Sequence, residues 1–251
     1  MRYLVIGAGG HAEEVSWSLR EQTATEGESC ELLFFDDRKP RGPLPSGLGS
    51  VVGTLSDVGQ VIADLAATAV TRGRNGNGKG GRGGASGSAS DPARAAGAQL
   101  VLGLGLPRVK SVVVSRLVGL GLVWKTVIHP RAIVGPNVVV GEGSYVAPGA
   151  ILTVNARVGS FVTINMHCQV AHDGVVEDFA TLHPDVHLAG KVAIGKGAEL
   201  GTGAIVIPGL SIGPWAVLGA GSTAVKSLIG GRTYVGIPAR DLRRERMAVV
   251  A

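Results

Sequence analysis

A strict period of six residues governs the hydrophobic pattern in the second half of the chain. Written in blocks of six from Ala132, the sequence runs through sixteen hexads to Ser227 without an insertion. In fifteen of them the third position is a branched aliphatic residue, and glycine or another small residue often follows it. A helix repeats near 3.6 residues and an ordinary strand alternates with period 2, so neither explains the pattern. A period of six predicts a β-helix of hexapeptide repeats.

Each hexad should form one flat side of a triangular coil, with its third residue pointing toward the axis and a small residue at the corner. Three hexads close a coil of about 18 residues, so residues 18 apart lie above one another on coils about 4.8 Å apart. The sixteen hexads predict a prism of slightly more than five coils. Because such a prism can be purely structural, function must come from residues that interrupt the repeat.

Before the prism, short apolar runs alternate with helical stretches. The pattern predicts strands over residues 3–6, 32–35 and 99–102, and helices over residues 12–20, 56–67 and 108–118. Alternation of strands and helices is typical of a small parallel sheet, here an α/β Rossmann-like domain. We expect this domain at residues 1–123, the prism at 124–229, and a closing C-terminal segment and tail at 230–251.

Composition limits the class of protein. Glycine accounts for 40 of 251 residues and aromatic residues for only ten, so the core must be aliphatic. No apolar run approaches the length of a membrane span, and the apolar stretch at the N-terminus is too short for a secretory signal, so we expect a cytoplasmic protein. Cys30 and Cys168 form no CxxC pair, and both are predicted to be buried thiols.

The net charge of +5 does not indicate a nucleic-acid partner. Residues 71–97 contain five basic residues and one Asp, and the rest of the chain is close to neutral. A nucleic-acid reader would combine a basic groove with stacking aromatic side chains, whereas this segment has no aromatic residue. Its richness in glycine and serine predicts a disordered surface insertion.

A glycine-rich turn follows the first predicted strand. Residues 7–12, GAGGHA, match the pattern G-x-G-x-x-A, in which backbone N–H groups and a helix N-terminus can hold a phosphate. Asp36 and Asp37 follow the second strand and could accept hydrogen bonds from a ribose or a base. They lie further along the chain than the nicotinamide fingerprint expects. We therefore favour a nucleotide-type ligand over NAD or a purely structural turn.

Histidines interrupt the hexads. Five of the six lie in the prism region, at positions 129, 167, 172, 183 and 187. His172 is followed by Asp173, which could orient the imidazole as a proton acceptor. A metal shared by His167 and His172 is the alternative, but residues 18 apart pair no histidine with another. The γ-class carbonic anhydrases carry a similar histidine pair and a third histidine two coils earlier, where this chain has Arg131, so we expect no metal.

Five short segments together resemble a known enzyme family. They are GAGGHAEEV at 7–15, FFDD at 34–37, VLGLGLPR at 101–108, INMHCQVAHD at 164–173 and YVGIPAR at 234–240. The ordered set resembles the nucleotide-sugar acetyltransferases of bacterial glycan biosynthesis, which include sialic acid O-acetyltransferases and bacillosamine and perosamine N-acetyltransferases. The resemblance implies a Rossmann-like domain followed by a left-handed β-helix, and a homotrimer.

The resemblance also implies a role for individual residues. His172 matches the general base that takes a proton from the attacking sugar amine or hydroxyl, and Asp173 matches the acidic neighbour that raises its basicity. The nucleotide-sugar would contact Gly9, Gly10, His11, Asp36, Asp37 and Gly103, with Asn165 near the acceptor. Acetyl-CoA would lie between prisms against Thr181, Thr202 and Ala220, under a closing segment that includes Gly236 and Pro238. Thr181 stands where the family often has a histidine.

These residues predict an acetyl-CoA-dependent N-acetyltransferase that acts on the amino group of a nucleotide-linked sugar. The amine would attack the thioester directly, without a metal or a covalent enzyme intermediate. One alternative keeps this chemistry and changes the acceptor to a sugar hydroxyl. Another is a prism without catalysis that binds a sugar nucleotide as a scaffold. No nucleic acid or membrane partner is expected.

Overall fold

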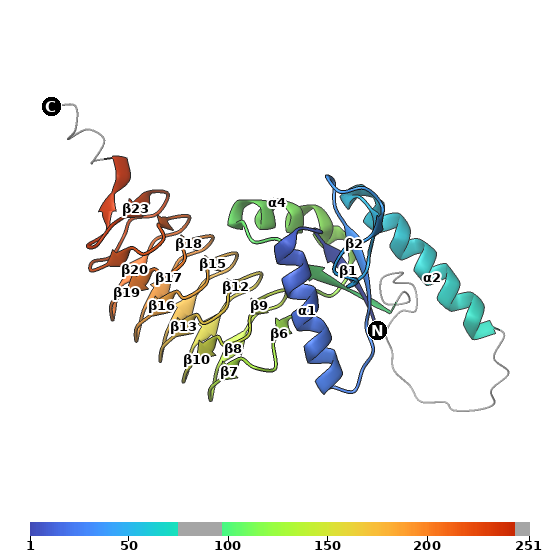
Figure 1. Cartoon of the computed structure of the whole chain (residues 1–251), viewed down its shortest axis with the longest axis horizontal. Helices are drawn as coiled ribbons and strands as arrows, with labels where there is room; N and C mark the ends of the chain where they lie inside the picture. Colours follow the sequence, from blue (N-terminus) through green and yellow to red (C-terminus); the bar gives the residue numbers. More distant parts are fainter. Residues whose placement is uncertain (75–96, 244–251) are drawn as a thin grey trace.

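The structure, a computed structural model, describes residues 1–74 and 97–243. An α/β domain is followed by a triangular prism of short, mostly two-residue parallel strands, which extends from β6 beside the α/β domain to β23 at the far end (Figure 1). The predicted order of an α/β domain and a parallel β-helix is therefore confirmed.

A five-stranded sheet in the order β3-β4-β2-β1-β5 forms the centre of the α/β domain. β1 (Arg2–Ile6), β2 (Glu31–Phe35), β4 (Ser50–Gly53) and β5 (Ala98–Leu102) are parallel, and β3 (Gly42–Pro43) pairs antiparallel with β4. The helices are α1 (Gly10–Thr25), α2 (Val58–Arg74) and α4 (Pro107–Leu117), with single 3-10 turns at Leu55–Asp57 and Val118–Leu120. The three predicted strands are confirmed, whereas the short strands β3 and β4 lie in a glycine- and proline-rich stretch that gave no strand signal.

Two sequence expectations change in this domain. The predicted insertion at 71–97 begins too early, because α2 continues to Arg74, and residues 75–96 lie outside the described residues. Cys168 is buried as predicted, but Cys30 is only partly buried. Among the described residues, no helix combines the length and apolar character that a membrane span requires.

The prism has three parallel sheets. Sheet 1 contains β6 (Val127–Ile128), β9 (Tyr145–Val146), β12 (Thr163–Ile164), β15 (Thr181–Leu182), β18 (Glu199–Leu200), β21 (Val217–Leu218), β23 (Thr233–Val235) and the antiparallel β24 (Arg240–Asp241). Sheet 2 contains β7 (Ile133–Val134), β10 (Ile151–Leu152), β13 (Gln169–Val170), β16 (His187–Leu188), β19 (Ile205–Val206) and β22 (Thr223–Ala224). Sheet 3 contains β8 (Val139–Val140), β11 (Arg157–Val158), β14 (Val175–Val176), β17 (Ala193–Ile194) and β20 (Ser211–Ile212).

The strand register confirms the predicted coil of 18 residues. Ile151 on β10 lies opposite Ile133 on one side and Gln169 on the other, each 18 positions away. The third residues of the hexads form the aliphatic axis of the prism and are almost all buried. Val134, with an exposed fraction of 43%, and the partly buried Val140 are the exceptions, because both belong to the first coil and have fewer neighbours to cover them.

Turns between the sheets form three corners, which we call the 1–2, 2–3 and 3–1 corners after the sheets they join. At the 2–3 corner, successive coils place Asn137, Asn155, Asp173, Lys191 and Gly209 above one another, all with φ between 59° and 73°. This left-handed conformation is easiest for glycine and next for asparagine and aspartate. Four of these five corner residues are asparagine, aspartate or glycine, and they recur at the 18-residue spacing of the coil.

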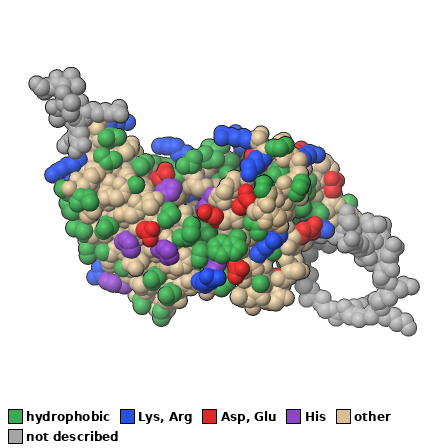
Figure 2. Space-filling model, viewed as in Figure 1, with side chains coloured by type: hydrophobic (Ala, Val, Ile, Leu, Met, Phe, Trp, Pro, Cys, Tyr) green, Lys and Arg blue, Asp and Glu red, His purple; other side chains and the backbone are tan. Residues whose placement is uncertain are grey.

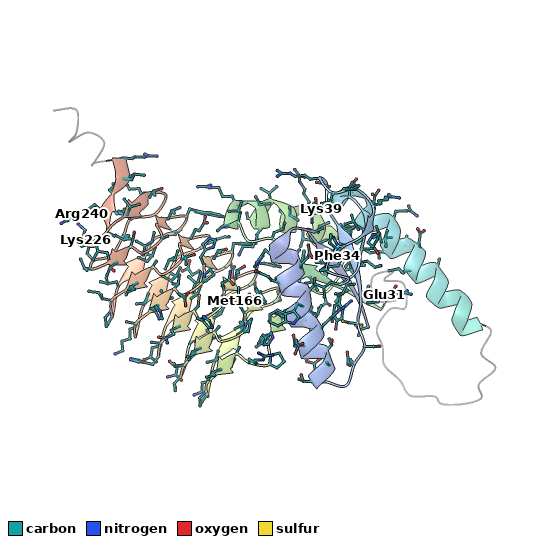
Figure 3. All side chains as sticks on the ribbon, in the orientation of Figure 1. Glu31, Phe34, Lys39, Met166, Lys226 and Arg240 are labelled. Atoms are coloured by element: carbon teal, nitrogen blue, oxygen red, sulfur yellow. The ribbon has the colours of Figure 1, made fainter. Side chains whose placement is uncertain are left out.

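The α/β domain packs on the outer face of sheet 1. The hydroxyls of Ser18 in α1 and Tyr145 in β9 lie 3.0 Å apart. From α4, the Lys110 Nζ donates to the Thr163 Oγ1 at 3.2 Å and to the Ala180 carbonyl at 3.1 Å. Figure 3 labels Met166 close to α1, and this side chain packs partly buried against the cluster that joins α1 to the prism. In the described part of the chain, these contacts lie on sheet 1 and leave sheets 2 and 3 uncovered.

Candidate active site

A cavity of about 490 Å³ opens at the carboxyl end of the central strands of the α/β domain. Of the predicted substrate residues, Gly9, Asp36, Asp37 and Gly103 line it. A Cβ on Gly103 would lie 2.6 Å from the Cβ of Ala12, so glycine is needed for the close approach of the strand end to α1. No atom lies within 4 Å of where a Gly9 Cβ would stand. The backbone at Gly9 is therefore open to a ligand at the N-terminus of α1.

The acidic pair after β2 also organises the walls of the cavity. The Asp36 carboxylate accepts from the backbone N–H groups of Ala8, Arg38 and Lys39 at 2.8 to 3.1 Å. Burial alone would raise the pKa of Asp36, but these backbone donors hold it below its usual value. The Asp37 Oδ1 accepts from the backbone N–H of Leu55 at 2.9 Å. Both carboxylates therefore fix loops around the cavity in addition to lining it.

Basic side chains at this cavity were missed by the sequence reasoning. Arg38 and Lys39 follow the acidic pair directly, and Arg116 in α4 reaches the same cavity. Figure 3 labels Lys39 at the edge of the domain, above Phe34 in the sheet. Cations beside an open helix N-terminus suit a ligand that carries phosphates. In the sequence, the basic dipeptide Arg38-Lys39 directly after FFDD is the feature that could have indicated these cations.

His11 and Gly10 lie next to the cavity, in the first turn of α1. The His11 Nδ1 lies 3.5 Å from Glu14 Oε2, and the ring packs edge-on against Tyr145 of the prism at 5.8 Å between centroids. The Nε2 of His11 is buried and has no hydrogen-bond partner among the described residues. A buried donor or acceptor without a partner is uncommon in proteins, so His11 offers a polar group where the α/β domain meets sheet 1.

His172 and Asp173 occupy the 2–3 corner between β13 and β14. The His172 Nδ1 lies 2.9 Å from Asp173 Oδ2, and 61% of the His172 side chain is exposed. The hydrogen bond to His172, followed by one from Asn155, holds the pKa of Asp173 below its usual value. An ionised carboxylate can only accept, so the neutral imidazole must carry its hydrogen on Nδ1. The lone pair of Nε2 is then available to accept a proton.

The imidazole lies across the corner of the next coil. A Cβ on Gly190, which is 18 residues after His172, would lie 2.3 Å from the Nε2 and 2.6 Å from the Cε1. Only a residue without a side chain allows the ring to lie in this position. The described residues provide no hydrogen-bond partner for Nε2.

Asn165 and Thr181 both lie away from the 2–3 corner. Asn165 is at the 1–2 corner, where its Oδ1 accepts from the backbone N–H of Met166 at 2.9 Å. Thr181 is buried on sheet 1 and its hydroxyl donates to the Gly105 carbonyl at 2.6 Å. In this chain Thr181 therefore contacts the α/β domain, and Gly105 connects it to the wall of the cavity.

The other residues predicted to contact acetyl-CoA gather at the 1–2 corner. Thr202 and Ala220 are 18 residues apart in turns of successive coils. The Gly236 backbone N–H donates to Ser222 Oγ at 2.9 Å, which holds the segment with Gly236 and Pro238 against the same corner of the last coil. The structure thus brings these four residues to one edge of the prism, while Thr181 lies on the neighbouring sheet.

A further imidazole–carboxylate pair, His183 and Glu199, was not predicted. The His183 Nε2 lies 2.9 Å from Glu199 Oε1, and this hydrogen bond holds the pKa of Glu199 below its usual value. The two residues are 16 positions apart, so the stacking of residues 18 apart does not predict their contact. Figure 2 shows histidine side chains gathered on the visible face of the prism with acidic side chains between them. Within the described ranges, no group of three or more His, Cys, Asp or Glu side chains is arranged to hold a metal ion.

The cavity and His172 lie on different sides of one chain. The α/β domain covers sheet 1, whereas the 2–3 corner with His172 is the edge of the triangle opposite that sheet.

Comparison with known proteins defines the class. No family model matches the sequence. GDP-perosamine N-acetyltransferase of Escherichia coli O157:H7 is 32% identical over 130 residues, which are 49% of this chain and 58% of that protein. The match therefore spans little more than half the length of this curated relative.

Solved structures cover almost the whole chain. The acetyltransferase domain of PglB from Neisseria gonorrhoeae FA1090, in complex with acetyl coenzyme A, has a TM-score of 0.75 and 26% identity over 96% of this chain and 98% of that one. PerB from Caulobacter crescentus, in complex with CoA and GDP-perosamine, has a TM-score of 0.73 and 27% identity over 96% of this chain and 97% of that one.

The fold is that of the left-handed β-helix acetyltransferases, preceded by an α/β domain. Within this class, the predicted resemblance to nucleotide-sugar acetyltransferases is confirmed, because the matched proteins include GDP-perosamine N-acetyltransferase and the acetyltransferase domain of PglB.

Proposed function

We propose that this protein transfers the acetyl group of acetyl-CoA to the amino group of a nucleotide-linked amino sugar. The observation that carries the proposal is the His172–Asp173 pair, exposed at a corner of the prism with Nε2 unoccupied. The phosphate-compatible cavity in the α/β domain supports a nucleotide-linked acceptor. The names of the relatives support the same donor and a GDP-linked amino sugar such as GDP-perosamine.

The reaction needs one base and no covalent enzyme intermediate. The neutral sugar amine attacks the thioester carbon, and the C–N bond forms as the carbonyl becomes an oxyanion. His172 takes the proton that the amine loses, through Nε2, while Nδ1–H donates to Asp173. The C–S bond then breaks, and the imidazolium returns its proton to the departing thiolate of coenzyme A. The products are an amide and free coenzyme A.

We further propose that the working enzyme is a homotrimer with active sites between subunits. The cavity and His172 lie on opposite sides of one prism, so a neighbouring chain must bring its His172 to the cavity. Aliphatic side chains are exposed on the uncovered sheets, among them Ile133 and Ile205 on sheet 2 and Val139 and Val175 on sheet 3. Contact between prisms would remove these side chains from water, which favours association.

The test is acetyl transfer to a panel of acceptors. Purified protein is incubated with acetyl-CoA and UDP-, dTDP- or GDP-linked amino sugars, and thiol release and product mass are followed. We expect turnover with one acceptor, and a loss of about a hundredfold or more in kcat for His172→Ala.

The possible results distinguish the proposed N-acetyltransferase from an O-acetyltransferase and from a scaffold without catalysis. Turnover only with sugars that carry a free hydroxyl and no amine would identify an O-acetyltransferase. Binding of a sugar nucleotide without thiol release from any acceptor would indicate the scaffold. Turnover in His172→Ala at the wild-type rate would disprove the role of this imidazole.

A further inference from the structure

The left-handed residues at the 2–3 corner are connected by side-chain hydrogen bonds from coil to coil. The Asn137 Nδ2 donates to Asn155 Oδ1 at 3.2 Å, and the Asn155 Nδ2 donates to Asp173 Oδ1 at 3.1 Å. The second oxygen of Asp173, Oδ2, lies 2.9 Å from the Nδ1 of His172. We call the series Asn137–Asn155–Asp173 the asparagine ladder. It runs from the coils nearest the α/β domain up to the imidazole.

The ladder fixes the orientation of the Asp173 carboxylate. A carboxylate on an exposed corner rotates about its terminal torsion, which has a broad energy profile. Because Asn155 donates to Oδ1, rotation would break that bond, and Oδ2 remains directed toward the imidazole. The carboxylate can only accept, so the Asn155 amide presents its NH₂ group to Asp173, and the Asn155 oxygen on the other side accepts from Asn137.

Lys191 is the charged group on the other side of Asp173. It lies one coil further along the same corner, and its positive charge also lowers the pKa of Asp173. A carboxylate without the asparagine bond would be free to turn toward this ammonium group and away from His172. Among the groups in the ladder, Asn155 is the one that opposes this movement by a direct bond.

We propose that Asn155 is a positioning residue, which acts through Asp173 to hold the His172 imidazole as the Nδ1–H tautomer. This inference rests on the proposed function of His172 as the base and extends it to the coil below. Asn155 touches neither the imidazole nor any reacting atom, so its contribution passes entirely through the carboxylate.

Asn155→Gly is the informative variant. Asn155 has φ of 62°, and glycine keeps this conformation without strain while it removes the amide. We expect kcat to fall about two- to tenfold, the range for loss of one hydrogen bond, with both KM values unchanged. The matched control is Asn137→Gly, which makes the same change at φ of 59° one coil away and leaves the Asn155–Asp173 bond intact. Its kcat should stay within twofold of the wild type.

A double-mutant cycle distinguishes positioning from a general effect on the prism. If Asn155 acts through Asp173, Asn155→Gly should have little further effect in an Asp173→Asn background, because the carboxylate is already absent. Equal fold losses in both backgrounds would overturn the proposal.

The tautomer can be measured without turnover. Imidazole ¹⁵N chemical shifts of His172 in selectively labelled protein should report hydrogen on Nδ1 in the wild type and in Asn137→Gly, and a mixture of tautomers in Asn155→Gly. An identical tautomer in all three proteins would overturn the inference. A normal tautomer response with no acetyl transfer to any acceptor would instead count against the proposed function alone.

Discussion

Gly190 shows how a single position in the repeat controls the candidate base. Its φ is outside the left-handed region, so alanine fits the backbone, but a Cβ would stand 2.3 Å from His172 Nε2. The exposed imidazole can rotate away, whereas the backbone of the coil cannot move as easily. A methyl group at this position therefore displaces the ring without unfolding the prism.

For Gly190→Ala we expect kcat to fall about tenfold or more, because the base moves away from the amine. The melting temperature should change little, because the group that must move is an exposed side chain. Steady-state kinetics and thermal unfolding measure the two effects. Gly119→Ala is the control, since no atom lies within 4 Å of its added Cβ. Wild-type kcat in Gly190→Ala would show that the imidazole does not work in the position described.

The sequence identified His172 and Asp173 because they interrupt a regular repeat. It did not reveal that Thr181 faces the α/β domain of its own chain, since a hexad pattern indicates which residues point outward but not what covers them. The His183–Glu199 pair was not predicted for a related reason. His183 lies in the 1–2 corner of one coil and Glu199 on strand β18 of the next coil, so only the folded chain shows that their side chains lie 2.9 Å apart.

Regular elements were predicted best where burial imposes a period. The hexads fixed the coil because every third-position side chain must reach the axis, and the strands of the α/β domain were found from their apolar runs. The helix predicted at 12–20 extends over Gly10–Thr25, because polar residues continue a helix without contributing to its apolar stripe. The packing of α4 on sheet 1 had no sequence signal, and neither did the burial of Lys110 in that contact.

Lys110 connects the stability of this contact to pH. Burial lowers the pKa of Lys110 from 10.5 to about 7. Between these values the unfolded chain binds one more proton than the folded chain, so the free energy of unfolding rises with pH, by at most about 1.4 kcal/mol per unit. From pH 7 to 8.5 we expect a gain of about 1 to 2 kcal/mol in the wild type. The gain should be absent in Lys110→Met.

Urea denaturation at fixed protein concentration, followed by tryptophan fluorescence, measures this slope. Trp124 is a suitable reporter because it packs against Phe161 where the α/β domain meets the prism. Lys226, labelled in Figure 3 on the part of the prism distant from the α/β domain, is exposed, and Lys226→Met should keep the wild-type dependence. The same slope in Lys110→Met and the wild type would show that Lys110 is not the group that titrates.

The arrangement of the whole chain places the two halves of the candidate site on opposite sides of the prism. The α/β domain covers sheet 1, so another copy can approach the prism at the 2–3 corner and the adjoining sheets. No pattern in the sequence shows this separation, because residues 9 and 172 are each predicted from their own local motif. If the cavity of one chain works with the His172 of another, the activity of a single variant cannot show it, and two variants must be combined.

Two inactive variants should restore activity to each other when they assemble together. His172→Ala lacks the base but keeps the cavity, whereas Gly9→Phe places a ring in the open space of the cavity at a backbone of φ −80° and ψ 178°, which phenylalanine tolerates. In a mixed trimer, a cavity from the first variant meets a His172 from the second.

Co-expressed, differently tagged chains purified through both tags should recover a sizeable fraction of wild-type turnover, and each variant alone should not. The double variant His172→Ala/Gly9→Phe co-assembled with wild type controls for simple dilution. If the mixed assemblies are as inactive as the two single variants, each chain completes its own site. The cavity and His172 of one chain would then have to move toward each other when substrate binds.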